Sequence, residues 1–245
     1  MAVATACSVE FSLRSCAALH EGAIPELHKN QVHVWWLPLH ESHPAIPQLR
    51  ELLSPDELDR AARFRFPRHN AQFVLTRGTL RRLLASYAGI SPQAIWFQYS
   101  EHEKPKAAGT DIEFNVSHTD GMAILGFTRG RRLGLDIEKL RTDFQTSEIA
   151  ERFFSAAERA ALRELPLDRR YLPFFRIWTR KEAYIKALGE GLSHPLHQFD
   201  VSLGDVAELL ATRPDPAERV RWQLQNLNIA LEFAAAAAVE REGKT

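Results

Sequence analysis

Two short segments carry acidic side chains at spacings that could bind a metal ion. If Leu133–Glu138 is a strand, its side chains alternate between faces, which places Gly134, Asp136 and Glu138 on one face. Two carboxylates about 6–7 Å apart repel each other unless a cation lies between them. Hard oxygen ligands of this kind suit Mg²⁺. Two exposed acids on an edge strand would show the same pattern, so the spacing alone leaves both interpretations open.

A helix predicted over Arg176–Leu188 could add a third carboxylate and a cation. It is followed by Gly189, the residue type that most often ends a helix. Trp178, Glu182 and Lys186 follow one another at intervals of four and therefore share a face. Glu182 could be a metal ligand or a general base, and Lys186 could neutralise phosphate. A surface ion pair beside an aromatic side chain explains the same spacing.

A third feature is a run of arginines without acids. Between Arg60 and Arg82 the chain has no aspartate or glutamate and has arginine at positions 60, 63, 65, 68, 77, 81 and 82. Guanidinium groups bind phosphate through paired hydrogen bonds and stay charged at any working pH. The run indicates a surface that faces phosphate, with a solvated helix face as the alternative.

His118 is a further candidate, at the end of a strand predicted over Phe114–His118. It would share a face with Phe114 and Val116, so a histidine packed in the core fits the pattern equally well. The other histidines show no zinc-ligand spacing. The sequence also has no Gly-x-Ser-x-Gly elbow and no glycine-rich phosphate loop.

The elements that must position these residues alternate between strands and helices. Further strands are predicted at Val32–Leu37, Ile95–Tyr99, Met122–Phe127, Phe199–Leu203, Arg219–Leu224 and Ile229–Val239. Helices are predicted from Ser54, from Asn70 to Gly89 and over much of 147–188, with capping boxes at Ser54–Glu57 and Ser155–Glu158. This order favours an α+β fold of two similar halves. We expect a loosely ordered leader over residues 1–30, an N-terminal half over 31–110 and a C-terminal half over 111–245.

Composition excludes some classes of protein. The 31 basic and 31 acidic side chains cancel, which excludes a polycation that binds nucleic acid through its bulk charge. No apolar run approaches the roughly 20 residues of a membrane span, and no basic residue precedes Arg14 as a secretory signal would require. We therefore expect a soluble, cytoplasmic protein that binds neither membranes nor nucleic acid.

Taken in order, several segments resemble the Sfp-type 4′-phosphopantetheinyl transferases. The segments are Lys104-Pro105, Phe114–His118, Gly134–Glu138, Phe153–Glu158 and Trp178–Gly191. Each motif is weak alone, but the set in this order is highly specific, and the resemblance spans about Val32 to Val239. It implies an α+β fold whose two similar halves are related by a pseudo-twofold axis.

The resemblance also implies a Mg²⁺-dependent reaction, with Mn²⁺ as an alternative metal. The 4′-phosphopantetheine arm of coenzyme A, the co-substrate, would move to a serine of an apo acyl carrier protein or peptidyl carrier protein, releasing adenosine 3′,5′-bisphosphate. Both halves of the site would lie in one chain, so we expect a monomer.

Residue roles follow from the same resemblance, position by position. It implies that Asp136, Glu138 and Glu182 are metal ligands and that Glu182 and Lys186 are catalytic residues, with Lys186 also at the pyrophosphate. Ser117 and His118 would contact coenzyme A, and Lys104 would lie near the adenine. Arg60 would lie near the 3′-phosphate, and Arg68 belongs to a Phe-x-Arg segment that would bind the co-substrate. Glu182 would take the serine proton directly or through a water on the metal.

Two departures and two alternatives accompany this interpretation. Glu103 replaces the usual glycine before Lys104-Pro105. Glu57 stands where some relatives have a lysine, so Arg63 or Arg77 would have to bind the 3′-phosphate in its place. A catalytically inactive module that binds coenzyme A or a carrier protein should lack one acid of the trio, and this chain has all three. A nucleic-acid-binding protein would use the arginines but would not need the trio.

Overall fold

The computed structural model describes residues 8–20, 24–102, 104–141, 146–191 and 194–241. Glu103, which replaces the usual glycine before Lys104-Pro105, lies outside these ranges. The strands are β1 (Glu10–Ser15), β2 (Gln31–Pro38), β3 (Phe97–Tyr99), β4 (Pro105–Ala107), β5 (Ile112–Thr119), β6 (Met122–Arg129), β7 (Leu133–Lys139), β8 (Phe199–Val201), β9 (Leu209–Thr212), β10 (Trp222–Asn226) and β11 (Phe233–Glu240). The α-helices are α1 (Ile46–Arg50), α2 (Pro55–Ala62), α3 (Pro67–Ala88), α4 (Thr146–Phe153), α5 (Ala156–Glu164) and α6 (Tyr171–Leu188). Short 3₁₀ helices are η1 (Cys16–His20), η2 (Pro92–Ala94), η3 (Leu167–Arg169), η5 (Leu196–Gln198) and η6 (Glu218–Arg221).

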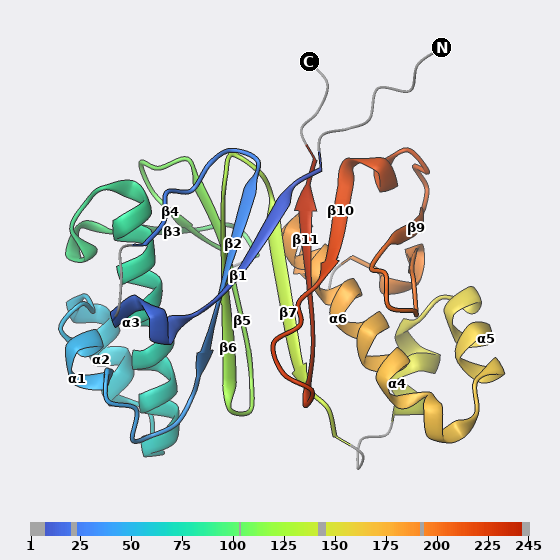
Figure 1. Ribbon diagram of the computed structural model, residues 1–245, viewed down its shortest axis with the longest axis horizontal. Helices are drawn as coiled ribbons and strands as arrows, with labels where there is room; N and C mark the ends of the chain where they lie inside the picture. The colour runs from blue at the N-terminus through green and yellow to red at the C-terminus, as the bar shows by residue number, and fades with distance from the viewer. Residues whose placement is uncertain (1–7, 21–23, 103, 142–145, 192–193, 242–245) are drawn as a thin grey trace.

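The two larger of the four sheets in the described residues stand between two groups of helices (Figure 1). Helices α1 to α3 lie on one outer side, and α4 to α6 lie on the other. None of the helices in the described ranges is long and apolar enough to cross a membrane. This mixed arrangement of helices on sheets, repeated in two halves, confirms the predicted α+β fold.

The first sheet has the strand order β1-β2-β6-β5 and packs against α3. Helix α3 begins at Pro67, where the missing N–H of proline costs no hydrogen bond, and is followed by Gly89 in the left-handed conformation, with φ of 68°. Trp35 of β2 and Phe127 of β6 are buried in the core that the sheet shares with this helix. The long helix is therefore fixed by its apolar face against one side of the sheet.

The second sheet has the strand order β10-β11-β7 and packs against α6. The two backbones touch at Gly134 of β7, where a Cβ atom would lie 2.0 Å from the carbonyl oxygen of Ala183 and 2.4 Å from the nitrogen of Ala187. Any side chain at this position would push the helix away, so glycine sets the spacing between β7 and α6.

The two sheets pack against each other through a shared core. Val34 of β2, Ile124 of β6 and Leu135 of β7 belong to it. Strand β11 is almost entirely alanine and is buried on both faces, which lets α6 and the first sheet approach it closely from opposite sides. Successive residues of β7 therefore face this core and α6 in turn.

The described part of residues 1–30 corrects the prediction of a loosely ordered leader. Strand β1 pairs with β2 in parallel over its whole length. Cys16 and Leu19 of η1 are buried in the first core, and Arg82 donates a hydrogen bond to the carbonyl oxygen of Leu19 at 2.6 Å. The order of this segment comes from pairing with a strand further along the chain, which the local sequence pattern does not show.

The predicted boundary between residues 110 and 111 also differs from the sheet topology. Strands β5 and β6 follow that boundary, yet they form one sheet with β2. The chain passes to the second sheet between β6 and β7. Strand periodicity indicates which face of a strand is apolar, but it does not identify the neighbouring strand.

A buried ion pair fixes α6 to the small elements around it. Lys181 is fully buried and its ammonium lies 2.9 Å from the carboxylate of Glu158, which is also buried. The same ammonium donates to the carbonyl oxygens of Leu196 and Phe199. Glu158 accepts from the backbone nitrogen of Ser155 and completes the capping box predicted for α5. Every donor of Lys181 is thus used inside the fold.

Replacing Gly134 by alanine should destabilise the protein by about 3 kcal/mol or more, because the new methyl group would overlap the backbone of α6. Gly204→Ala is the matched control, since a Cβ atom there meets nothing within 4 Å. Urea unfolding of both variants measures the difference. Equal stabilities of the two variants would contradict the close approach of α6 to β7.

Candidate active site

The three acids and Lys186 come together where α6 packs on β7. Asp136 and Glu138 lie on the face of β7 that Gly134 turns towards the helix, and Glu182 and Lys186 project from the helix. The charges of Asp136 and Lys186 act on both glutamates. The structure therefore brings together the four residues that the sequence placed on two separate elements.

Asp136 is the most enclosed of these acids, with 4% of its surface exposed. Its Oδ1 atom accepts hydrogen bonds from the Lys186 ammonium at 2.6 Å and from the Ser117 hydroxyl at 3.0 Å. Its Oδ2 atom is buried and has no hydrogen-bond partner. Leaving a buried acceptor unpaired costs on the order of 1–3 kcal/mol, and more for a charged group. An unpaired buried carboxylate oxygen is what a cation-binding site would provide.

Burial and the crowding of negative charge shift the pKa values of the two glutamates. Burial, followed by repulsion from the Asp136 carboxylate, raises the pKa of Glu182 to about 7. The same two causes raise the pKa of Glu138, while the ammonium of Lys186 opposes both shifts. Additional positive charge at this place would relieve the repulsion.

The acids do not form a finished ligand cage. Within the described ranges, no three His, Cys, Asp or Glu side chains are grouped so that they could hold a metal ion. Instead, Lys186 is paired with Asp136. The residues fit Mg²⁺ by their donor chemistry, because this ion takes carboxylate oxygens, and by the unpaired Oδ2 atom of Asp136.

A pocket of about 560 Å³ lies against the first sheet, between α2, α3 and β5. Its lining includes Arg60, Phe73, Arg77, Pro105, Phe114 and His118. Desolvation, followed by the positive charge of Lys186, lowers the pKa of His118. His118 therefore marks the end of the pocket that lies nearest the acidic trio.

The structure divides the run of arginines into different roles. Arg81 is buried, and its guanidinium bonds to the carboxylate of Glu57 at 2.6 Å and to two backbone carbonyls. Arg82 holds η1 through Leu19. These two arginines are structural, so the interpretation of the whole run as a phosphate-facing surface is wrong for them. The acid that pairs with Arg81 lies just before the run, on a neighbouring helix.

Two other arginines line the pocket. The guanidinium groups of Arg60 and Arg77 lie 5.3 and 6.0 Å from the ring centre of Phe73. Arg77 also lies 3.5 Å from the carboxylate of Glu57, but its buried Nη1 has no hydrogen-bond partner. Arg63, the other candidate for completing an anion site, is exposed at the end of α2. The free donor of Arg77 makes it the better candidate.

Arg68 is exposed and lies outside the residues that line the pocket. Its guanidinium lies 5.9 Å from the ring of Phe66, which is half exposed. Lys139 and, to a smaller extent, Arg68 lower the pKa of Asp120 in the turn after β5. Arg68 is thus placed towards the turn between β5 and β6 and does not line the pocket.

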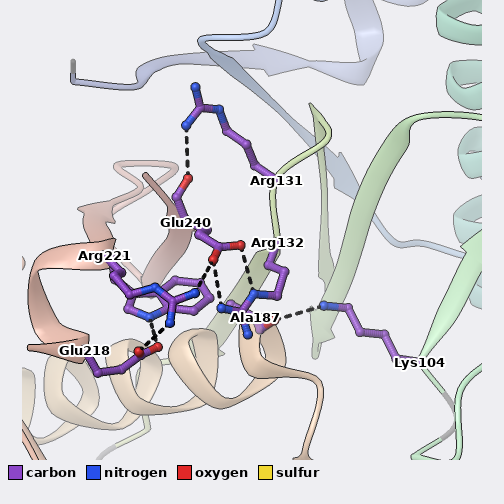
Figure 2. A network of polar contacts seen from close by, with 8 residues as sticks. Lys104, Arg131, Arg132, Ala187, Glu218, Arg221 and Glu240 are labelled. Atoms are coloured by element: carbon purple, nitrogen blue, oxygen red, sulfur yellow. Dashed lines mark hydrogen bonds and ion pairs between the residues drawn. The ribbon is translucent and has the colours of Figure 1, made fainter. Parts of the chain in front are cut away.

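Lys104 is bound to the end of α6 instead of facing the pocket. Its ammonium donates to the carbonyl oxygens of Lys186 at 2.8 Å, Leu133 at 3.1 Å and Ala187 at 3.4 Å. Figure 2 shows it pointing from the first half towards Ala187. Burial lowers the pKa of Lys104 to about 8. Its neighbour Pro105, and not Lys104, lines the pocket.

Figure 2 also shows the charged network on the far side of this helix end. The carboxylate of Glu240 accepts hydrogen bonds from Arg132 and Arg221, each at 2.9 Å. These hydrogen bonds, with Arg132 as the larger cause, lower the pKa of Glu240 to about 2. The network joins the end of β11 to the start of β7.

Sequence reasoning missed two residues that contact the acidic trio. The hydroxyl of Thr119 lies 3.5 Å from the carboxylate of Glu138. A hydrogen bond from the Trp178 side chain to the same carboxylate partly opposes the rise in the pKa of Glu138 that burial and Asp136 cause. The four-residue spacing along α6 places Trp178 on the face of Glu182 but does not indicate its contact with Glu138. Thr119 could have been found from the polar alternation of Asn115, Ser117 and Thr119 along β5.

Several known proteins that are similar to this chain are 4′-phosphopantetheinyl transferases. The family model of the 4′-phosphopantetheinyl transferase superfamily matches residues 132–238. The 4′-phosphopantetheinyl transferase HetI of Nostoc sp. is 38% identical over 178 residues, covering 71% of this chain and 75% of the relative. The 4′-phosphopantetheinyl transferase Sfp of Bacillus subtilis is 30% identical over 164 residues, covering 66% and 72%. The crystal structure of Thermotoga maritima holo-[acyl-carrier-protein] synthase is similar over 46% of this chain and 64% of that chain, at 21% identity and a TM-score of 0.37.

Replacing Lys104 by methionine should cost about 1–3 kcal/mol of stability, because three backbone carbonyls lose a charged donor. Lys106→Met is the matched control, since Lys106 lies two residues away and is well exposed. Chemical unfolding compares the two. A stable Lys104→Met variant with weaker binding of a pocket ligand would instead place Lys104 at the ligand.

Proposed function

Because the chain belongs to the Sfp-type 4′-phosphopantetheinyl transferases, we propose that its pocket binds coenzyme A and that Asp136, Glu138 and Glu182 bind Mg²⁺ beside it. The protein is an enzyme that transfers the 4′-phosphopantetheine arm of coenzyme A to carrier proteins. The observation that carries the assignment of the site is the contact between Asp136 and Lys186 near His118, at one end of the pocket.

The nucleotide part of coenzyme A is assigned to the pocket between α2, α3 and β5. Phe73 and Phe114 offer aromatic and apolar surface for the adenosine, and the volume of about 560 Å³ is in the range of small-molecule sites. Arg60 and Arg77 would hold the 3′-phosphate, since both line the pocket and Arg77 has an unused buried donor. Arg68 and Lys104 are not needed for this placement.

The pyrophosphate is assigned to the space between His118 and Lys186. It would lie next to the ammonium that now pairs with Asp136. Mg²⁺ held by the three carboxylates would neutralise further charge on the phosphate oxygens, and Mn²⁺ has the same preference for oxygen ligands. The binding of anionic substrate and cation would relieve the crowding of like charges among the acids.

The transfer then needs positioning and one proton acceptor. The hydroxyl oxygen of the carrier serine attacks the phosphorus that bears the pantetheine arm, forming a new P–O bond. The P–O bond to adenosine 3′,5′-bisphosphate breaks, and its electron pair leaves with that product. We assign Glu182 as the acceptor of the serine proton and Lys186 as the cation that stabilises the charge on the leaving group.

The partner of the reaction is an apo carrier protein that presents its serine to this end of the pocket. The pocket and the acidic trio come from one chain, so we propose that the enzyme acts as a monomer. An inactive module that binds coenzyme A or a carrier without transfer is the alternative. The complete trio together with Lys186 favours catalysis over this alternative.

Asp136→Asn and Glu182→Gln should each lower transfer by about 1,000-fold, because each removes charge where the transition state forms. Mass spectrometry of an apo carrier protein incubated with coenzyme A and Mg²⁺ measures the added arm. Chelation of the metal should abolish the mass shift in the unchanged enzyme, and added Mg²⁺ should restore it.

Glu164→Gln serves as the control for these variants, because Glu164 is an exposed acid at the end of α5. It should retain full transfer. Thermal unfolding of all three variants checks that the fold is intact. Complete modification of the carrier by Asp136→Asn or Glu182→Gln would reject the assignment of the acids.

Arg60→Gln should raise the KM for coenzyme A by about 10-fold, the loss expected for one charge-assisted hydrogen bond. It should leave the KM for dephospho-coenzyme A, which lacks the 3′-phosphate, nearly unchanged. Arg65→Gln is the control, because Arg65 is exposed and lies outside the pocket lining. A similar rise with both substrates would show that Arg60 does not bind the 3′-phosphate.

A further inference from the structure

Strands β5 and β7 lie against each other but belong to different sheets. β5 is the last strand of the first sheet, and β7 is the last strand of the second. Across the whole of these two described strands, no backbone hydrogen bonds pair them. The contact is extensive all the same, and it is where the two halves of the molecule meet beside the acidic trio.

The edge of β7 that faces β5 has amide groups that need acceptors. Alternate amides of β7 pair with β11, which leaves those of Leu135, Ile137 and Lys139 pointing to the other side. Unpaired amides at a buried edge are costly. In a continuous sheet, backbone carbonyls of the next strand would accept from them.

Here three side chains of β5 take the place of those carbonyls. The amide of Leu135 donates to Asn115 Oδ1 at 2.8 Å. The amide of Ile137 donates to Ser117 Oγ at 3.4 Å, and the amide of Lys139 donates to Thr119 Oγ1 at 3.3 Å. The acceptors lie at every second position of β5 and the donors at every second position of β7. The two strands are thus joined by a ladder whose rungs are side chains.

The two hydroxyl rungs also contact the acids. A hydroxyl has one hydrogen to donate and two lone pairs to accept with. Because Ser117 accepts from Ile137, it can donate its hydrogen to Asp136 Oδ1, 3.0 Å away. In the same way Thr119 accepts from Lys139 and donates to Glu138 Oε2 at 3.5 Å.

We propose that Asn115, Ser117 and Thr119 form a ladder that locks β7 to β5, and that Thr119 is a positioning residue for Glu138. The positioning role rests on the proposed function, because it assumes that Glu138 binds the metal. Each hydroxyl rung holds a β7 amide and the carboxylate of the preceding residue at once. The ladder therefore couples the spacing of the two halves to the orientation of the acids.

Thr119→Val removes the hydroxyl and keeps the shape of the side chain. The amide of Lys139 then loses its acceptor, and its hydrogen exchange, followed by NMR, should become about 10-fold faster. The affinity for Mg²⁺, measured by calorimetry without substrates, should fall about 10-fold, as is typical when a residue that orients a metal ligand is lost. The KM for coenzyme A should change little, because Thr119 does not line the pocket.

Thr119→Ser is the rescue variant, since it restores the hydroxyl, and both measurements should return towards those of the unchanged enzyme. Thr128→Val is the matched control. Thr128 is a fully buried threonine of β6 whose hydroxyl donates to the carbonyl oxygen of Gln31, away from the acids. It should leave the exchange of the Lys139 amide and the affinity for Mg²⁺ unchanged. If Thr119→Val does not fold, Asn115→Leu tests the ladder through the exchange of the Leu135 amide.

The two readouts separate failure of the ladder from failure of the proposed function. Unchanged exchange of Lys139 in Thr119→Val would overturn the ladder, whatever the metal does. Faster exchange with unchanged affinity for Mg²⁺ would overturn the positioning role and keep the ladder. If the unchanged enzyme bound no Mg²⁺ at all, the metal site of the proposed function would fail with the positioning role, while the exchange data would still decide the ladder.

Discussion

The direct packing of α6 on β7 is the contact on which the candidate active site depends. It exists because Gly134 has no side chain, so the backbone of the helix reaches the backbone of the strand. Asp136 and Glu138 are the next residues on the same face of β7, and they are therefore brought against Glu182 and Lys186. On the buried side of the helix, Lys181 is paired with Glu158 and cannot rotate towards the site. Lys181 and Glu182 are adjacent in α6 but have different roles. Lys181 stabilises the fold, and Glu182 belongs to the candidate site.

Charge is unevenly distributed around the candidate site, although the protein as a whole is neutral. The 31 basic and 31 acidic side chains cancel in number, but not in position. Three acids lie around one lysine, and burial, followed by repulsion from the Asp136 carboxylate, raises the pKa of Glu182 and of Glu138. On the side of the first sheet, Arg60 and Arg77 line the pocket, and the buried Nη1 donor of Arg77 has no hydrogen-bond partner. An anionic substrate would neutralise the arginines of the pocket, and a divalent cation would neutralise the three acids.

Strand β5 connects the two sides because its faces differ. Phe114, Val116 and His118 line the pocket, whereas Ser117 and Thr119 turn towards β7 and the acids. The reaction we propose takes place across this strand, between a pocket of the first half and acids of the second. The close fit of the halves, including the side-chain ladder and the cap that Lys104 places on α6, would for that reason contribute to the proposed active site.

The sequence alone determined the features that depend on residues near one another in the chain. The alternation in β7 predicted that Asp136 and Glu138 share a face, the four-residue spacing predicted the same for Glu182 and Lys186, and the capping box predicted the start of α5. These follow from the fixed periods of strand and helix, which repeat over a few residues. The family, and with it the reaction, could also be inferred from the order of such motifs.

Only the tertiary structure decided which elements are neighbours. It showed that β1 is a strand, that Arg81 is paired with Glu57, that Lys104 caps a helix of the other half, and that Thr119 reaches Glu138. Each of these depends on a partner far away in the chain. A local period fixes which way a side chain faces, but the group that it meets is set by the packing of whole sheets and helices.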